Sequence, residues 1–315
     1  MRPGLSRLPV VAALLLLPAL ELRAESRLEK VLKLSPGGHF RLDTDLGSVT
    51  VTGKATPDVR LDITSRRQLE DLLTLRFDEA AGSVTVTARR KRLFSGWFGD
   101  SGRLHYEIEV PAETALDIDT SGGGISVAAL RSGAKLDTSG GGITVRDLVG
   151  ALEADTSGGS IQLADVQGRM RVQTSGGGIH GSNLDGDLSA ETSGGSIELE
   201  RVTGDIHASS SGGGIHIREA GGFVDAETSG GGIEASFTKG NARGGRLETS
   251  GGGIEVAIDP EVGFEVDAQG SYVKTEVPVR VVGETSRHTL RGSLGKGGAP
   301  LYLRTSGGGV RIRAL

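Results

Sequence analysis

The chain has no cysteine, few aromatic side chains and a single long apolar run, and each of these scarcities excludes something. Without cysteine among its 315 residues, it can form neither a disulfide framework nor a cysteine-linked lipid anchor. Aromatic residues make up only 3% of the chain, so the core must be thin and rich in Ile, Val, Leu, Ala and Thr. The net charge of -5 includes interspersed cations and gives no general basic surface, which argues against nucleic acid as a partner.

The single long apolar run lies near the first residue and predicts export. Two arginines accompany an apolar stretch over residues 10–17, prolines flank that stretch, and Ala24 offers a small residue for cleavage. The stretch is too short for a membrane helix, so we expect a signal peptide over residues 1–24. The mature chain would begin at Glu25 and has no second apolar stretch to anchor it. We therefore expect a periplasmic, outer-surface or secreted bacterial protein.

The strongest feature that is present is a repeated hexapeptide, Thr-Ser-Gly-Gly-(Gly/Ser)-Ile. Seven successive copies keep a period of 18 residues, an eighth follows three extra residues later, and a ninth closes the printed sequence. The copies begin at Thr120, Thr138, Thr156, Thr174, Thr192, Ser210, Thr228, Thr249 and Thr305. A fixed period of this length is typical of a repeat architecture.

Aligned by this period, the repeats show which positions are apolar. The positions four and two residues before the Thr are apolar, and the residues between them are mostly charged or polar, as in Leu116, Asp117 and Ile118. Ile stands five residues after the Thr in all seven regular copies, and a second apolar position follows two residues later. Alternation with a period of two predicts strands. Each unit is therefore expected to be strand, turn, strand, turn.

Units this small cannot bury an apolar face alone, so neighbouring units must stack around a shared core. We expect an all-β protein whose 18-residue coils form a β-solenoid over residues 113–256. Less regular β caps are expected over residues 25–112 and over residues 257–315, the latter including the final repeat. The alternative is an antiparallel meander in which each Ser-Gly-Gly-Gly is a hairpin loop.

Several stretches resemble a known bacterial family. They are Leu-Gly-Ser-Val-Thr-Val-Thr-Gly at 46–53, Tyr-Glu-Ile-Glu-Val-Pro at 106–111 before the first hexapeptide, and Leu-Tyr-Leu-Arg at 301–304 before the last one. They look like the bacterial β-strand-repeat adhesins, also called toastrack domains. The resemblance covers nearly all of the mature chain and implies an exported, non-enzymatic β-solenoid of the cell envelope. It implies no catalytic residues, and this chain lacks the membrane tether of some members.

The glycines and threonines of the repeat are interpreted as architecture. The 52 Gly keep a fixed phase and are expected to be turn residues with positive φ. A phosphate-cradling loop would need a following helix, and here a strand follows. The stacked threonines are expected to form a hydroxyl ladder along the rod.

An acidic column stands immediately before the repeat Thr and suggests a metal site. In a solenoid, Asp119, Asp137 and Asp155 would project from one face roughly 4.8 Å apart. Calcium binds clustered carboxylate oxygens, so these three residues are candidate calcium ligands. The alternative is that solvent, salt and neighbours such as Lys135 and Arg171 relieve the repulsion. No other cofactor is expected.

One irregular segment combines cations with aromatic side chains. It contains Arg89, Arg90, Lys91, Arg92, Phe94, Trp97 and Phe98. This composition suits an anionic membrane surface or an acidic glycan, and the alternative is an aromatic plug in the end of the solenoid.

No catalytic constellation stands out from the repeat. The six His share no metal-ligand spacing, and the acids that recur do so as parts of the repeat. We therefore expect a non-enzymatic adhesin or scaffold that binds an envelope protein, a glycan or a membrane surface. The alternative is a carbohydrate-binding or carbohydrate-cleaving β-helix.

Overall fold

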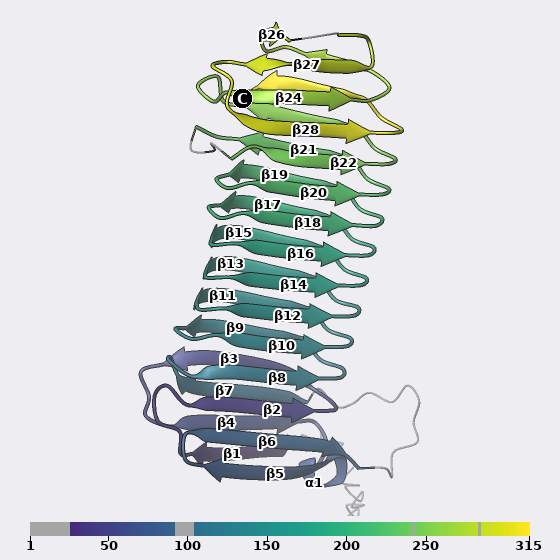
Figure 1. Ribbon diagram of the computed structural model, residues 1–315. Helices are drawn as coiled ribbons and strands as arrows, with labels where there is room; N and C mark the ends of the chain where they lie inside the picture. Colours follow the sequence, from purple (N-terminus) through teal and green to yellow (C-terminus); the bar gives the residue numbers. More distant parts are fainter. Residues whose placement is uncertain (1–25, 92–103, 240, 242, 283–284) are drawn as a thin grey trace, which may run out of the picture.

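A computed structural model describes residues 26–91, 104–239, 241, 243–282 and 285–315 of the chain. Two long sheets stand face to face, and the chain winds between them as a rod of stacked coils (Figure 1). Within the described residues there are 29 strands and one helix of a single turn, α1 (Leu69–Leu72). The expected all-β solenoid is confirmed.

Sheet A, as we name the first sheet, has fourteen strands. In spatial order they are β1 (Ser26–Leu32), β4 (Val59–Ser65), β7 (His105–Pro111), β3 (Ser48–Lys54), β9 (Ile125–Leu130), β11 (Ile143–Val149), β13 (Ile161–Gln167), β15 (Ile179–Asp185), β17 (Ile197–Val202), β19 (Ile215–Ala220), β21 (Ile233–Phe237), β23 (Ile254–Ile258), β29 (Val310–Ala314) and β25 (Val273–Thr275).

Sheet B has fifteen strands. In spatial order they are β26 (Val279–Val281), β27 (Thr289–Leu294), β24 (Phe264–Gln269), β28 (Ala299–Thr305), β22 (Gly245–Thr249), β20 (Val224–Thr228), β18 (Ile206–Ser210), β16 (Leu188–Thr192), β14 (Met170–Thr174), β12 (Leu152–Thr156), β10 (Ala134–Thr138), β8 (Ala115–Thr120), β2 (His39–Thr44), β6 (Ser83–Arg90) and β5 (Leu73–Ala80).

The repeats pair in parallel, one whole coil apart. Thr138 lies opposite Thr156 in sheet B, and Ile143 lies opposite Ile161 in sheet A. A coil is therefore one strand of sheet B, the Ser-Gly turn, one strand of sheet A and a second turn. The hairpin alternative is wrong for the repeats, because a hairpin would place consecutive strands antiparallel in one sheet.

The inner columns of the two sheets meet in one continuous core. The apolar positions of the alignment are buried in every regular coil, as with Leu116, Ile118 and Ile125 in the first. Because successive side chains of a strand point to opposite sides of the sheet, the polar residues between the buried positions face outward on two flat faces. Those faces, rather than the interior, are available to a ligand.

The irregular ends of the chain extend the stack and then close it. β2 and β3 form a coil in register with the first repeat, with Thr44 opposite Thr120. At the other end, the ninth repeat stacks directly on the eighth, with Thr305 opposite Thr249. The segment between them lies beyond this last coil as β24, β27, β25 and β26. Antiparallel pairing is confined to the two ends, at β1, β4 and β7, at β5 and β6, and at β24, β27 and β26.

The described residues contain no helix long and apolar enough to cross a lipid bilayer. The expected signal peptide over residues 1–24 lies outside the described residues.

Candidate functional site

The repeat threonine fastens each turn to the one before it. Thr156 is buried, its Oγ1 donates to the carbonyl oxygen of Gly141 at 2.7 Å, and the same Oγ1 accepts from the amide of Gly159 at 3.3 Å. Ser210 makes the same pair of bonds with Gly195 and Gly213. The expected hydroxyl ladder thus exists, but each hydroxyl bonds to backbone rather than to the next hydroxyl.

The middle glycine of each turn is required for a different reason than positive φ. A Cβ on Gly141 would lie 2.3 Å from the backbone of Gly123 in the preceding turn, so only glycine allows the turns to stack this closely. Among the glycines of the regular coils, positive φ occurs in the second turn, for example at Gly168 with φ 132°. The expectation of positive φ in the Ser-Gly turn was wrong.

The acidic row on sheet B is longer than the repeat predicts. Asp119, Asp137 and Asp155 lie in register on adjacent strands, as expected. Asp43 of β2 lies opposite Asp119 and extends the row by one strand. The alignment missed Asp43 because it belongs to the irregular N-terminal part of the chain.

Burial and mutual repulsion act on this row together. Burial raises the pKa of the Asp137 carboxyl, Lys135 opposes the rise, and Asp155 and Asp119 add to it. Burial also raises the pKa of Asp155. The Nζ atom of Lys135 in turn lies 3.5 Å from Oε1 of Glu153. Elsewhere on this face, carboxylates form ion pairs with cationic side chains, as Asp117 does with Arg41.

Within the described ranges, no group of three or more His, Asp or Glu side chains is arranged to hold a metal ion. The three aspartates form a line along the rod rather than a cluster around one point. The calcium hypothesis for Asp119, Asp137 and Asp155 remains a prediction.

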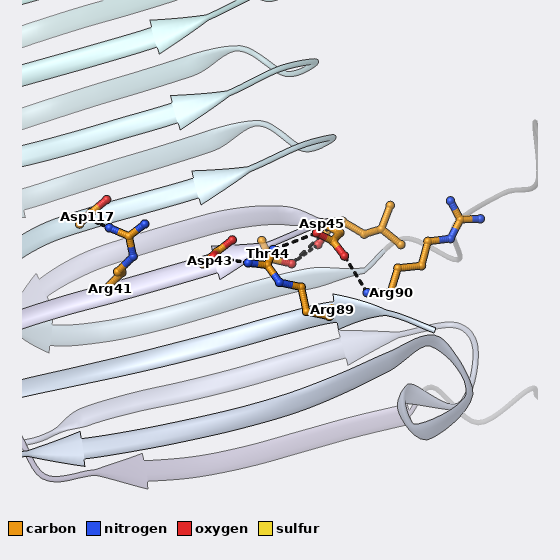
Figure 2. Close-up of polar contacts among 8 residues, drawn as sticks. Arg41, Asp43, Thr44, Asp45, Arg89, Arg90 and Asp117 are labelled. Carbon is orange, nitrogen blue, oxygen red and sulfur yellow. Dashed lines mark hydrogen bonds and ion pairs between the residues drawn. The ribbon is translucent and has the colours of Figure 1, made fainter. Parts of the chain in front are cut away.

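The basic and aromatic segment begins at the end of β6, and its first cation, Arg89, forms ion pairs (Figure 2). The guanidinium of Arg89 pairs with Asp43, and its Nη1 lies 2.9 Å from Oδ1 of Asp45. The Arg90 amide donates to Asp45 Oδ2 at 2.9 Å, and Lys91 Nζ donates to the carbonyl oxygen of Glu70. Arg89 therefore holds the strand end in place as well as carrying charge.

The other members of this segment, Arg92, Phe94, Trp97 and Phe98, lie outside the described residues. From Lys91 on, the segment belongs to the connection between β6 and β7, which takes the place of the short Ser-Gly turn of the regular coils. Its proposed contact with a membrane or glycan remains a prediction.

An elongated hollow over the regular coils lies on the outer face of sheet A. It has a volume of about 630 Å³ and crosses six strands, from β11 to β21. One wall is the outward row Thr144, Gln162, His180, Glu198, His216 and Glu234, and the other is Arg146, Ala164, Ser182, Glu200 and Arg218. The strand backbone between the rows forms the floor. We call this hollow the sheet A groove.

Contacts between His and Glu of adjacent coils order the first wall. His180 Nε2 lies 3.6 Å from Glu198 Oε2, and His216 Nδ1 lies 3.3 Å from Glu234 Oε2. These side chains remain about half exposed. Arg146 and Arg218 of the second wall make no ion pair to another described residue. The groove thus offers both acceptors and donors to solvent.

A backbone feature places a third outward row beside the groove. The ninth residue after each repeat Thr has left-handed φ in six consecutive coils, including Asn183 at 55° and Arg201 at 57°. Two successive side chains therefore face outward at this point of each strand. Asn183 Nδ2 donates to Asp165 Oδ1 at 2.8 Å, and Arg201 Nε donates to Asn183 Oδ1 at 2.7 Å. This hydrogen-bonded ladder stiffens the edge of the groove.

A second hollow adjoins the groove at its C-terminal end. It has a volume of about 370 Å³, and its lining shares His216 and Glu234 with the groove. The ring of Tyr272 lies against Gly309 so closely that a Cβ there would be 2.2 Å from the ring. Tyr272 is 37% exposed. Neither Tyr272 nor the groove could be predicted from the sequence, because both depend on which coils become neighbours.

Comparison with known proteins finds one matching family and several solved structures. A family described as "Toastrack DUF4097" matches residues 39–313, and no curated protein matches. Among solved structures, a "putative adhesin" from Bacteroides fragilis is 13% identical, covering 93% of this chain and 99% of its own, with a TM-score of 0.39. A "putative lipid binding protein" from Parabacteroides distasonis is 13% identical, covering 92% of this chain and 97% of its own, with a TM-score of 0.34.

Proposed function

The chain belongs to the Toastrack DUF4097 family, and we propose from this premise that it is an exported, non-enzymatic binding scaffold of the bacterial cell envelope or surface. The observation that carries the proposal is the sheet A groove, which presents two rows of polar side chains along a rigid rod. The rod has a continuous core, and hydrogen bonds join its successive turns. It can therefore hold these rows of side chains in place without a ligand.

The chemistry of the groove favours binding over catalysis. A general acid and base need environments that separate their pKa values, which usually means burial. The side chains of His216 and Glu234 are 43% and 45% exposed, and they pair with each other along a regular row. Such groups can orient a ligand through hydrogen bonds.

Export and binding can be tested in one experiment. The full chain is expressed in a Gram-negative host, and we expect it in the periplasmic or extracellular fraction with Glu25 as its first residue. The purified mature chain is then sedimented with isolated bacterial envelopes. We expect the double variant His180→Ala/His216→Ala to sediment less than wild type.

The matched control lies on the opposite face. Changing His207 of β18 to Ala alters a half-exposed His that pairs with Asp225, at 3.2 Å, outside the groove, and it should sediment like wild type. Cytoplasmic retention, or equal sedimentation of both variants, would contradict the proposal.

The basic and aromatic segment is a second candidate binding element, because its four consecutive cations stand next to Phe94, Trp97 and Phe98. The test retains Arg89, since its pairs with Asp43 and Asp45 stabilise the strand end. The variant Arg90→Ser/Lys91→Ser/Arg92→Ser is expected to lose binding to vesicles that contain anionic lipid. Equal binding by the variant and wild type would remove the segment as a membrane contact.

A further inference from the structure

The sheet A groove and the adjoining hollow make a long binding surface with a direction. The groove starts at β11, and the second hollow ends at β29 and Tyr272, so the two together follow the rod axis over seven strand spacings. At roughly 4.8 Å per spacing, this is about 34 Å. A ligand that fills it must be extended and must run across the strands.

The side chains of the surface indicate a ligand that both donates and accepts hydrogen bonds. Glu198, Glu234 and Glu255 present carboxylate oxygens, which only accept when ionised. Arg146 and Arg218 present guanidinium groups, which only donate. Because anionic and cationic side chains both occur along the surface, a polyanion or a polycation would be repelled at several points. Hydroxyl groups satisfy both kinds.

Tyr272 adds an apolar surface at one end. Its ring is fixed against Gly309, and Lys274 Nζ lies 5.4 Å from the ring centroid. A ring held in this way while remaining partly exposed can pack against a flat ligand face without losing further side-chain freedom. One face of a pyranose ring is apolar, and its rim carries hydroxyls.

We propose that this surface binds a linear, uncharged glycan along the rod axis, with one sugar ring packed on Tyr272. The inference rests on the proposed binding scaffold and names the class of its ligand. A pyranose unit in an extended chain is about as long as one strand spacing, roughly 4.8 Å. Successive sugars can therefore meet successive coils, whose outward residues differ from coil to coil.

The test uses the full mature chain and defined sugars. Binding of cellohexaose, chitohexaose, xylohexaose and mannohexaose is measured by calorimetry, with the corresponding monosaccharides as controls. We expect at least one hexasaccharide to bind and its monosaccharide to bind at least 100-fold more weakly. Tyr272→Ala should weaken hexasaccharide binding at least tenfold, and Glu198→Gln should weaken it severalfold.

The chain supplies a matched control in Tyr302. This tyrosine is 42% exposed on β28 of sheet B, outside both hollows. Tyr302→Ala should bind the hexasaccharide like wild type. The melting temperature of each variant is measured alongside. Amide hydrogen exchange of the wild-type protein should slow over β11 to β21 when the sugar binds. This second measurement needs no variant, so it still tests the proposal if Tyr272→Ala is poorly folded.

The outcomes separate this inference from the proposed function. If no hexasaccharide binds while the chain still sediments with envelopes through the groove, the glycan class is wrong and the scaffold proposal stands. Binding only to lipid vesicles would likewise overturn the glycan proposal. If hexasaccharide binding survives both Tyr272→Ala and Glu198→Gln, the glycan lies elsewhere and the groove assignment fails.

Discussion

Each repeat threonine joins two consecutive turns through one hydroxyl. Thr156→Val keeps the shape of the side chain but removes a donor from Gly141 and an acceptor from Gly159. Both backbone groups lie in partly exposed turns, so we expect the free energy of unfolding to fall by about 1 kcal/mol. Urea denaturation measures the change.

The control for this substitution already exists in the chain. Ser210 makes the same two bonds in its own coil, so Thr156→Ser should lose much less stability than Thr156→Val. Equal losses would mean that the methyl group, rather than the hydroxyl, stabilises the turn.

The acidic row on sheet B predicts a pH dependence. Burial is the main effect that raises the pKa of Asp137 above its ordinary value of 3.8. The nearby charge of Lys135 lowers this pKa, whereas the charges of Asp155 and Asp119 raise it further. A raised carboxyl pKa means that the folded state takes up protons more readily than the unfolded state. The resulting destabilisation is present above the folded pKa and is relieved as the pH falls through it.

Asp137→Asn should therefore stabilise the protein at pH 7 by about 0.5 kcal/mol, as expected for half-exposed charges. The difference should vanish near pH 3, where the carboxyl is protonated, and thermal melting at both pH values in chelator checks this. A calcium ladder makes a distinct prediction, since added calcium would then raise the melting temperature of wild type and not of Asp137→Asn. Destabilisation by Asp137→Asn at pH 7 in chelator would contradict the repulsion argument.

At the scale of the element, we expect the edge strands at the β1 and β5 end of the rod to disfavour association with other chains. β1 and β5 are the last strands at one end, and Leu28, Leu75 and Phe77 are only partly buried there. Lys30 points in the same direction as Leu28 and Leu32, and its Nζ lies 3.8 Å from the centroid of the Phe77 ring. An inward charge on an edge strand disfavours pairing with another sheet.

Lys30→Met keeps the length of this side chain and removes its charge. We expect the variant to associate end to end, with dimers and longer species increasing with concentration in sedimentation velocity. Lys33→Met is the matched control, because Lys33 pairs with Asp58 and is 81% exposed. A Lys30→Met variant that stays monomeric at all concentrations would show that the charge is not needed.

At the scale of the whole molecule, every regular coil has its inner residues at the same positions as its neighbours, in register with them. Deleting residues 157–174 joins Thr156 to Ser175 and removes one complete coil without changing the phase. Stability in such stacks is roughly a sum over units and their interfaces, so we expect a folded rod shorter by roughly 4.8 Å in X-ray scattering. Deleting residues 157–165 removes half a coil, and this control should not fold, because inward and outward residues would exchange places.

Much of this architecture could be predicted from local periodicity, and the failures concern neighbours that are distant in sequence. The Ile column and the repeat Thr predicted both strands of a coil. Nothing in the alignment could place Thr305 directly after Thr249, since the chain between β23 and β28 first forms β24 to β27, which lie beyond the last coil. The pairing of Arg89 with Asp43 was hidden for the same reason.

The candidate site was harder to predict than the fold. Tyr272 acquires its place from its contact with Gly309, which is set by the packing of β25 on β29. The recurrence of the middle glycines is visible in the sequence, but their role depends on the distance between stacked turns. The outward residues of the groove, such as Thr144, Gln162 and His180, differ from coil to coil, so sequence patterns could not distinguish the groove from the rest of the surface.

The division between repeated inner positions and varied outer positions has an evolutionary consequence. Ile143, Ile161 and Ile179 are the same residue in three successive coils, whereas the next residues, Thr144, Gln162 and His180, all differ. Mutations in the outer row change the surface without disturbing the packing that maintains the fold. Lineages carrying this scaffold can therefore diversify what they recognise one coil at a time, while selection on folding acts on a separate set of positions.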